Sequence, residues 1–166
     1  MDYAVEIYKL SNKFYTDYPE TQYPELMLKN NRPYTCLLIE TKDEYFICVP
    51  FRSNITHKDA FLFKNTQRSS HTPSGLDYRK TVIIKNSEYI DSVTKAIVDD
   101  DEYKATIANI ERIVNEVNEY VEKYIKHIQQ TSILHPREFE RHYQYSTLKY
   151  FHDILRLNIW NYTKLN

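Results

Sequence analysis

Short apolar runs separated by polar turns predict a β-sheet in the first half of the chain. Each run is four to seven residues long and rich in β-branched and aromatic residues, which is typical of strands. The runs with strand character are residues 5–10, 34–40, 45–49, 60–63 and 81–84. The second and third are separated only by the polar turn 41–44, so they predict a hairpin. The pattern as a whole indicates a mainly antiparallel sheet.

The hydrophobic pattern changes from a strand-like to a helical period after residue 91. Apolar side chains recur at steps of three and four, which predicts one long amphipathic helix; they are Ile107, Ile110, Val114, Val117, Val121, Tyr124 and Ile128. The acidic run Asp99–Glu102 suits the positive end of its dipole. Pro136 begins a predicted last helix, with apolar positions at Phe139, Tyr143, Leu148, Phe151, Ile154 and Leu155. Residues 11–24 predict loop, with Pro24 opening a short helical turn.

Strands followed by helices predict an α+β fold in which helices pack a compact, strongly twisted sheet. The 166 residues predict a single domain, sheet-rich over 1–90 and helical over 91–166. Apolar residues make up 42% and charged residues 27%, a globular composition. The N-terminus does not resemble a signal peptide, and no apolar run has the length of a membrane helix. Cys36 and Cys48 are therefore expected to be reduced thiols in a cytoplasmic protein, packed in the core.

Charge is distributed unevenly along the chain although the net charge is −1. Residues 50–85 hold seven basic and two acidic side chains, and residues 86–130 hold five basic and ten acidic ones. The first segment is a candidate surface for a polyanion, and the second predicts a solvated acidic helix. The single glycine, Gly75, excludes Gly-rich phosphate loops and predicts either a turn with a positive backbone angle or the close approach of another group.

The polar segment after Pro50 holds the strongest candidate chemistry. Metal-free RNA cleavage needs a base for the ribose 2′-hydroxyl, donors for the charged transition state and an acid for the leaving oxygen. This segment supplies a cation, hydroxyls, an amide and an imidazole at Arg52, Ser53, Asn54, Thr56 and His57. Arg52 can donate in a fork to phosphate, Ser53 and Asn54 can bind or orient it, and His57 can move protons. The competing interpretation is a solvated basic pair with a structural loop histidine.

Other residues extend this site or compete with it. Lys80, in a second basic cluster, is predicted to neutralise charge at the catalytic site. Sixteen tyrosines, several beside basic residues, suit stacking on single-stranded nucleic acid, although core packing explains some of them. The predicted RNA-binding residues are Lys29, Arg32, Tyr34, Thr56, Lys58, Lys64, Tyr78 and Arg79. No histidine or cysteine has zinc spacing, and the consecutive acids Asp99–Asp101 favour helix capping over a metal site. We therefore expect neither a metal nor another cofactor.

Several stretches resemble the toxins of type III toxin–antitoxin systems, the ToxN/CptN/TenpN group, and within it the CptN branch. The stretches that carry the resemblance are residues 7–11, 32–34, 49–61 and 75–84. The resemblance covers most of residues 3–90 and fades in the helical half. It implies a Kid/MazF-like fold and a metal-independent endoribonuclease that leaves a 2′,3′-cyclic phosphate. It also implies inhibition by a repeated pseudoknot RNA antitoxin in a closed protein–RNA assembly, with cellular or phage RNA as the substrate.

The residues of the central motif match this group only in part. Ser53 matches the serine of the ToxN active-site core, whereas Arg52 stands in place of its threonine and Ile55 in place of its lysine. We therefore hypothesise that His57, together with Arg52, takes over the acid or base role. Two alternatives stay open: a non-catalytic RNA-binding module that uses the same basic strip, and a helical interaction protein whose acidic C-terminal half is the working part.

Overall fold

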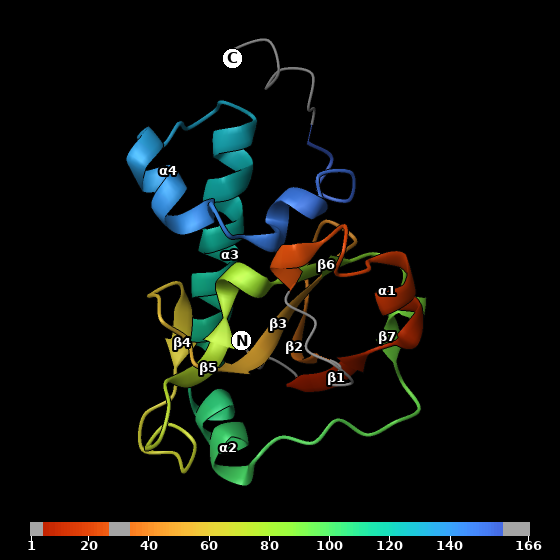
Figure 1. The fold of residues 1–166 in the computed structure, drawn as a ribbon, viewed down its shortest axis with the longest axis vertical. Coiled ribbons are helices and arrows are strands. Elements are labelled where there is room, and N and C mark those ends of the chain that lie inside the picture. Colours follow the sequence, from red (N-terminus) through yellow and green to blue (C-terminus); the bar gives the residue numbers. More distant parts are fainter. Residues whose placement is uncertain (1–4, 27–33, 158–166) are drawn as a thin grey trace.

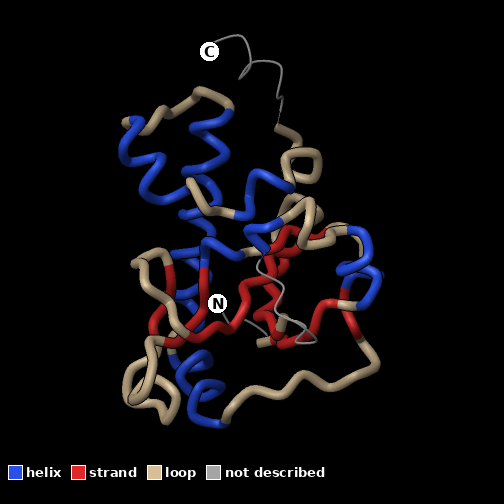
Figure 2. Tube along the Cα trace, viewed as in Figure 1, coloured by secondary structure: helices blue, strands red, loops and turns tan. Residues whose placement is uncertain are grey.

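The computed structural model describes residues 5–26 and 34–157 (Figure 1). It shows an α+β fold, as the sequence predicts: an antiparallel sheet lies in the middle of the molecule and helices surround it (Figure 2). The predicted RNA-binding residues Lys29 and Arg32 lie outside the described residues. None of the described helices is both long enough and apolar enough to cross a membrane.

Seven strands form the sheet in the described part of the chain. They are β1 (Glu6–Leu10), β2 (Thr35–Glu40), β3 (Phe46–Ser53), β4 (Ala60–Leu62), β5 (Ser74–Asp77), β6 (Val82–Ile84) and β7 (Ile90–Asp91). Their order is β4-β5-β3-β2-β1-β7, with β6 pairing to β3 off this path, and all pairings are antiparallel. The predicted hairpin is present as β2 and β3, and each predicted strand has a counterpart within a few residues.

Strand β3 has two successive partners along one edge. Its first part pairs with β6 through Phe46–Cys48, and its last part pairs with β5 through Phe51–Ser53. Pro50 stands at this fork, where neither half-strand pairs with it, so its missing N–H interrupts neither pairing. The sequence predicted that the strand ends before Pro50, and this was wrong: the strand continues to Ser53. The short 3₁₀ turn η2 (Tyr78–Lys80) fills the gap between the two half-strands.

Gly75 lies inside strand β5, so the predicted turn at this position was wrong. The alternative prediction, a close approach of another group, is confirmed. A Cβ atom at Gly75 would lie 1.9 Å from the backbone oxygen of Phe61 in the neighbouring strand. Any other residue at this position would force the backbone of β4 to move.

The helices lie around the sheet as separate, mostly short elements. They are α1 (Asn12–Asp17), α2 (Asp100–Ala108), α3 (Ile110–Ile128) and α4 (Pro136–Tyr143), with 3₁₀ turns η1 (Pro24–Leu26), η3 (Ser87–Tyr89) and η4 (Thr147–Tyr150). The single long helix predicted from residue 99 to 128 is two helices that meet at Asn109, whose backbone leaves the helical region. The predicted last helix begins at Pro136, but it ends at Tyr143.

The start of α2 differs in detail from the predicted cap. Asp99 occupies the N-cap position, yet its side chain makes no capping hydrogen bond and instead accepts one from Arg68 at 3.1 Å. The following acids lie in the first turn, where the helix dipole favours them.

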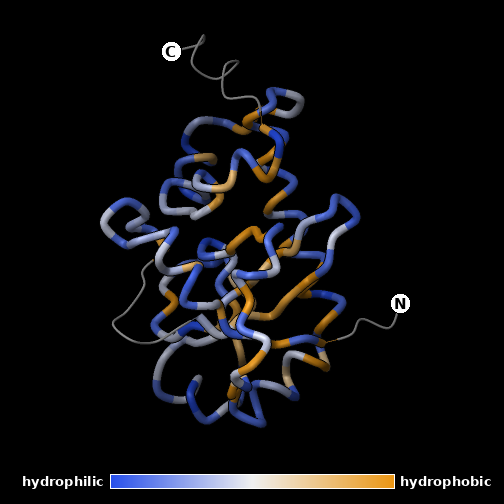
Figure 3. Tube along the Cα trace, turned by 90° about the vertical axis from the view of Figure 1, so that its right-hand side faces the viewer, coloured by the Kyte–Doolittle hydropathy of each residue, from blue (hydrophilic) through white to orange (hydrophobic). Residues whose placement is uncertain are grey.

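The apolar faces of the sheet and of α3 form one core, visible as the hydrophobic segments at the centre of Figure 3. Ile113 and Val117 of α3 are fully buried against it. Cys36 and Cys48 are buried, unpaired thiols, and burial raises the pKa of each. They are core residues, as the sequence predicts.

Candidate active site

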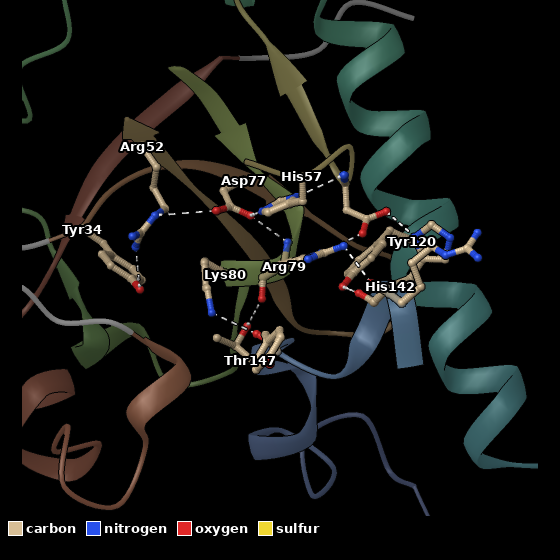
Figure 4. A network of polar contacts seen from close by, with 12 residues as sticks. Tyr34, Arg52, His57, Asp77, Arg79, Lys80, Tyr120, His142 and Thr147 are labelled. Atoms are coloured by element: carbon tan, nitrogen blue, oxygen red, sulfur yellow. Dashed lines mark hydrogen bonds and ion pairs between the residues drawn. The ribbon is translucent and has the colours of Figure 1, made fainter. Parts of the chain in front are cut away.

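A chain of polar contacts runs across one face of the sheet and ends at α4 (Figure 4). Its centre is Asp77, which the sequence analysis did not assign to the site. Arg52 lies opposite Gly75 in the pairing of β3 and β5, so Asp77, two residues further along, lies on the same face as Arg52. Because Gly75 has no side chain, the guanidinium can reach diagonally across it to the carboxylate.

Asp77 is a buried carboxylate that gathers three donors. Its Oδ1 lies 3.1 Å from Nε2 of His57 and accepts the backbone N–H of Arg79 at 3.0 Å. Its Oδ2 lies 3.6 Å from Nε of Arg52. Asp77 therefore fixes the positions of Arg52 and His57 relative to each other.

Tyr34 lies on the other side of Arg52. Nη1 of Arg52 is 3.4 Å from the Tyr34 hydroxyl, and its guanidinium carbon is 5.9 Å from the ring centre. Tyr34 is buried, and burial raises its pKa, so its hydroxyl stays protonated at neutral pH. The phenol and the carboxylate together restrict the guanidinium to one narrow region above the sheet.

The contacts of His57 occupy both of its ring nitrogens. Nδ1 accepts the backbone N–H of Asp59 at 3.1 Å, so the ring proton lies on Nε2 and points to Asp77. The ring would have to break one of these contacts before it could take a proton from a substrate. This geometry favours a positioning role for His57 over the predicted acid–base role.

Asp59 links the same loop to α4 at the far end of the contact chain. Its Oδ2 accepts from Nε of Arg79 at 2.8 Å, and its Oδ1 lies 2.8 Å from Nδ1 of His142. Arg79 also donates to the backbone oxygen of Arg141 at 2.8 Å. Arg79, predicted to bind RNA, is thus half-buried and holds α4 against the sheet.

Lys80 is enclosed at the fork of the sheet, with only 7% of its surface exposed. Its Nζ donates to the backbone oxygen of Tyr145 at 2.9 Å. Burial lowers the pKa of this lysine to about 8; the nearby carboxylate of Asp77 acts in the opposite direction, and Arg52 lowers it further. A lysine with this pKa exchanges protons near neutral pH, unlike an ordinary surface lysine.

The structure does not bring all the predicted catalytic residues together. Ser53 follows Arg52 in β3, so strand alternation directs its side chain to the opposite face. Asn54 has a left-handed backbone with φ of 58°, and its side-chain oxygen accepts from the hydroxyl of Thr72 at 2.5 Å. Asn54 therefore shapes the turn after β3, a conformation that asparagine tolerates well.

The predicted RNA-binding residues divide into exposed and buried groups. Thr56, Lys58 and Lys64 are exposed and available to a polyanion. Tyr78 is buried, and its hydroxyl donates to Glu116 at 2.7 Å, so it cannot stack on a base at the surface in this arrangement.

The residues missed from the sequence are Asp77, Asp59 and His142. No recognised motif spacing marks any of them, and the three come from separate parts of the chain. Asp77 could have been found only from the register of β5 against β3, which places it diagonally across from Arg52. Among the described residues, no group of three or more histidine, cysteine or acidic side chains has the geometry to hold a metal ion.

Comparison with protein-family models, with curated proteins and with solved structures found no match to this chain. The resemblance to the ToxN/CptN/TenpN group and to the Kid/MazF fold therefore stays a prediction from the sequence motifs.

Proposed function

We propose that this protein is a cytoplasmic endoribonuclease toxin that cleaves RNA through attack of a ribose 2′-hydroxyl on the adjacent phosphate. The observation that carries the proposal is that Arg52 and Lys80 both lie near Asp77. One is a guanidinium held in place by Asp77 and Tyr34, and the other is a buried lysine with a pKa of about 8. A positioned cation supplies the donors for the charged transition state, and a group that exchanges protons near neutral pH supplies the base and the acid.

In this mechanism Arg52 binds the phosphate and stabilises the negative charge that grows on its oxygens. Asp77 and Tyr34 keep the guanidinium in place, and His57 supports Asp77 from the other side. Lys80 moves the proton once its contact with the backbone oxygen of Tyr145 opens. In its neutral form it accepts the proton of the 2′-hydroxyl, and in the resulting charged form it protonates the leaving 5′-oxygen. The products are a 2′,3′-cyclic phosphate and a 5′-hydroxyl.

The exposed lysines supply a surface for RNA beyond the reacting phosphate. Lys58 and Lys64 lie on the segments between β3 and β5, on both sides of β4. The sequence resemblance extends the proposal to a partner: a repeated pseudoknot RNA that covers the site and keeps the toxin inactive in a closed assembly. A short repeat-encoded RNA should then co-purify with the protein from its native cells.

Mapping the end groups of cleaved RNA tests the reaction. Purified protein, incubated with a mixed RNA in EDTA, should give fragments with 2′,3′-cyclic phosphate and 5′-hydroxyl ends. Fragments with 5′-phosphate ends, or cleavage that stops when the chelator is added, would contradict the proposal.

Substitution of Lys80 separates catalysis from RNA binding. Lys80→Met should lower the cleavage rate by about 100-fold or more, since it removes the proton-transfer group, while affinity for a non-cleavable 2′-deoxy analogue changes little. The matched control is Lys104→Met, which removes an exposed lysine of α2 outside the basic segment and should keep the wild-type rate. Binding without cleavage by the wild-type protein would instead favour the non-catalytic RNA-binding module.

A further inference from the structure

A cavity of about 290 Å³ opens at the α4 end of the polar contact chain. It lies between the loop that holds His57, strand β4, and helices α3 and α4, and it shares Asp59 and His142 with the contact chain in Figure 4. The proposed mechanism uses no group inside it. Its walls are both aromatic and charged, a combination that binds planar polar ligands.

Three tyrosine rings, Tyr78, Tyr120 and Tyr143, form the aromatic part of the wall. Their hydroxyls are already occupied: Tyr120 donates to the backbone oxygen of His142 at 2.8 Å, and Tyr143 donates to that of Tyr120 at 2.7 Å. Tyr78 donates to Glu116. Since these contacts fix the rings, the cavity keeps its aromatic wall without a ligand present.

The charged side chains of the wall fall into two groups. Glu116 and Glu119 are already paired, with Arg112 at 2.6 Å and with Lys123 at 2.9 Å. Glu138 of α4 and Lys58 are both exposed, and the described residues provide no ion pair for either of them. The cavity therefore offers a carboxylate and an ammonium group to a ligand.

We infer that this cavity binds one nucleobase of the RNA substrate and prefers a base with an exocyclic amino group, an inference that rests on the proposed ribonuclease function. The carboxylate of Glu138 accepts from the amino group, as carboxylates do from base amino groups elsewhere. The base contacts those parts of the tyrosine rings that line the cavity, without stacking on an exposed ring face. Lys58, at the rim, binds the backbone phosphate that follows the base. Adenine, cytosine and guanine carry the amino group, whereas uracil does not.

The position of the cavity links base recognition to cleavage. Asp59 lines the cavity, its backbone N–H holds His57, and its carboxylate holds Arg79. A base in the cavity therefore lies against the same loop that supports the cation site. The bound base would select which phosphate of the strand reaches Arg52.

Cleavage of a randomised RNA pool, read by sequencing of the fragment ends, tests the inference. Wild-type protein should disfavour uracil at one position flanking the cleaved bond, and Glu138→Gln should reduce this discrimination by about tenfold while cleavage continues. The control Glu140→Gln makes the same charge change two residues along α4, away from the cavity, and should keep the wild-type profile. An unchanged profile for Glu138→Gln would overturn the base pocket and leave the ribonuclease proposal intact.

Binding of single nucleotides separates the two proposals if no RNA is cleaved. Methyl resonances of Leu134, which lines the cavity, should shift saturably in NMR spectra with the 3′-monophosphates of adenosine, cytidine or guanosine, and less with that of uridine. Glu138→Gln should weaken binding of the adenosine, cytidine and guanosine monophosphates and leave binding of the uridine monophosphate unchanged. Failure of all four nucleotides to shift Leu134 would overturn the pocket whether or not the protein cleaves RNA.

Discussion

The ammonium group of Lys80 is enclosed by the fork of the sheet and by the backbone that carries Tyr145. Burial opposes its charge, and one carboxylate, Asp77, only partly offsets this cost. We therefore expect that an apolar side chain at this position would give a more stable fold. Such a cost at a buried position is typical of a residue that is kept for function.

The pH dependence of stability reports directly on Lys80. Its folded pKa of about 8 lies below the ordinary value of 10.5. Between these values the unfolded chain holds more protons at this position than the folded chain does, so this position favours folding increasingly as pH rises. The stability gained by Lys80→Met should therefore shrink by about 1–2 kcal/mol between pH 7 and pH 9.5 in urea unfolding. The exposed Lys64→Met should show no such pH dependence; equal gains at both pH values for Lys80→Met would contradict the buried charge.

Gly75 allows a second prediction at the scale of one residue. Gly75→Ala places a methyl group on the backbone oxygen of Phe61, and strand β4 must move to accept it. The free energy of unfolding should fall by about 1–3 kcal/mol or more. The neighbouring Ser74→Ala is the control: the Ser74 hydroxyl is buried without a hydrogen-bond partner among the described residues, so its removal should not destabilise the fold. Equal stability of Gly75→Ala and Ser74→Ala in chemical unfolding would disprove the close approach.

Single residues show where sequence reasoning succeeds and where it stops. The uniqueness of Gly75 was visible in the sequence, and one of its two predicted causes is correct. Arg52 and Lys80 were identified because cations cluster there, and the structure places both near Asp77. Asp77 could not be identified from the sequence. The role of a single carboxylate in a strand depends on which residue lies diagonally across the sheet from it, here Arg52.

The break between α2 and α3 shows the same limit at the scale of secondary structure elements. Apolar residues continue at helical steps through Asn109, so the pattern predicts one helix. The side chain of Asn109 instead donates to the backbone oxygen of Ala105 at 2.8 Å, and its backbone turns out of the helix. Asparagine side chains are known to compete with the helix for backbone hydrogen-bond partners. The periodic pattern of apolar residues does not show at which asparagine this competition ends a helix.

The break separates two isoleucines whose burial differs from the predicted pattern, in which Ile107 belongs to the apolar stripe and Ile113 does not. Ile107 at the end of α2 is 43% exposed, whereas Ile113 in α3 is fully buried against the sheet. Ile113→Ala should lower the free energy of unfolding by about 2–5 kcal/mol because it leaves a cavity in the core. Ile107→Ala should change it by less than about 0.5 kcal/mol, and urea unfolding of both variants measures the contrast. Equal losses at the two positions would contradict this difference in burial.

Across the whole molecule, the folded arrangement neutralises much of the positive charge that residues 50–85 carry in the sequence. Arg52 lies against Asp77, Arg79 pairs with Asp59, and Arg68 pairs with Asp99 of the acidic half. Lys58, Lys64 and Lys85 remain exposed. The sequence identified the basic segment correctly, but it could not show which cations the fold itself would use.

The salt dependence of RNA binding shows how many of the seven basic residues in 50–85 contact phosphate in the folded protein. Binding of a non-cleavable single-stranded RNA should follow a slope of about −3 in a plot of log affinity against log salt, as expected for four phosphate contacts, made by the three exposed lysines and Arg52. All seven basic residues would give a slope of about −5. Fluorescence anisotropy measured between about 50 and 200 mM salt decides between the two slopes. A slope near −5 would show that the internal ion pairs open when RNA binds.

The forked pairing of β3 also constrains how the sequence around Lys80 can vary. Strands β5 and β6 both pair with the continuous strand β3. The distance between β5 and β6 is therefore set by β3 and not by the turn that joins them. An insertion in that turn would have to form a bulge, and a deletion would have to stretch the backbone, because β3 holds both β5 and β6 in register. Homologous chains that share this architecture should therefore keep the length of the turn while its side chains diverge.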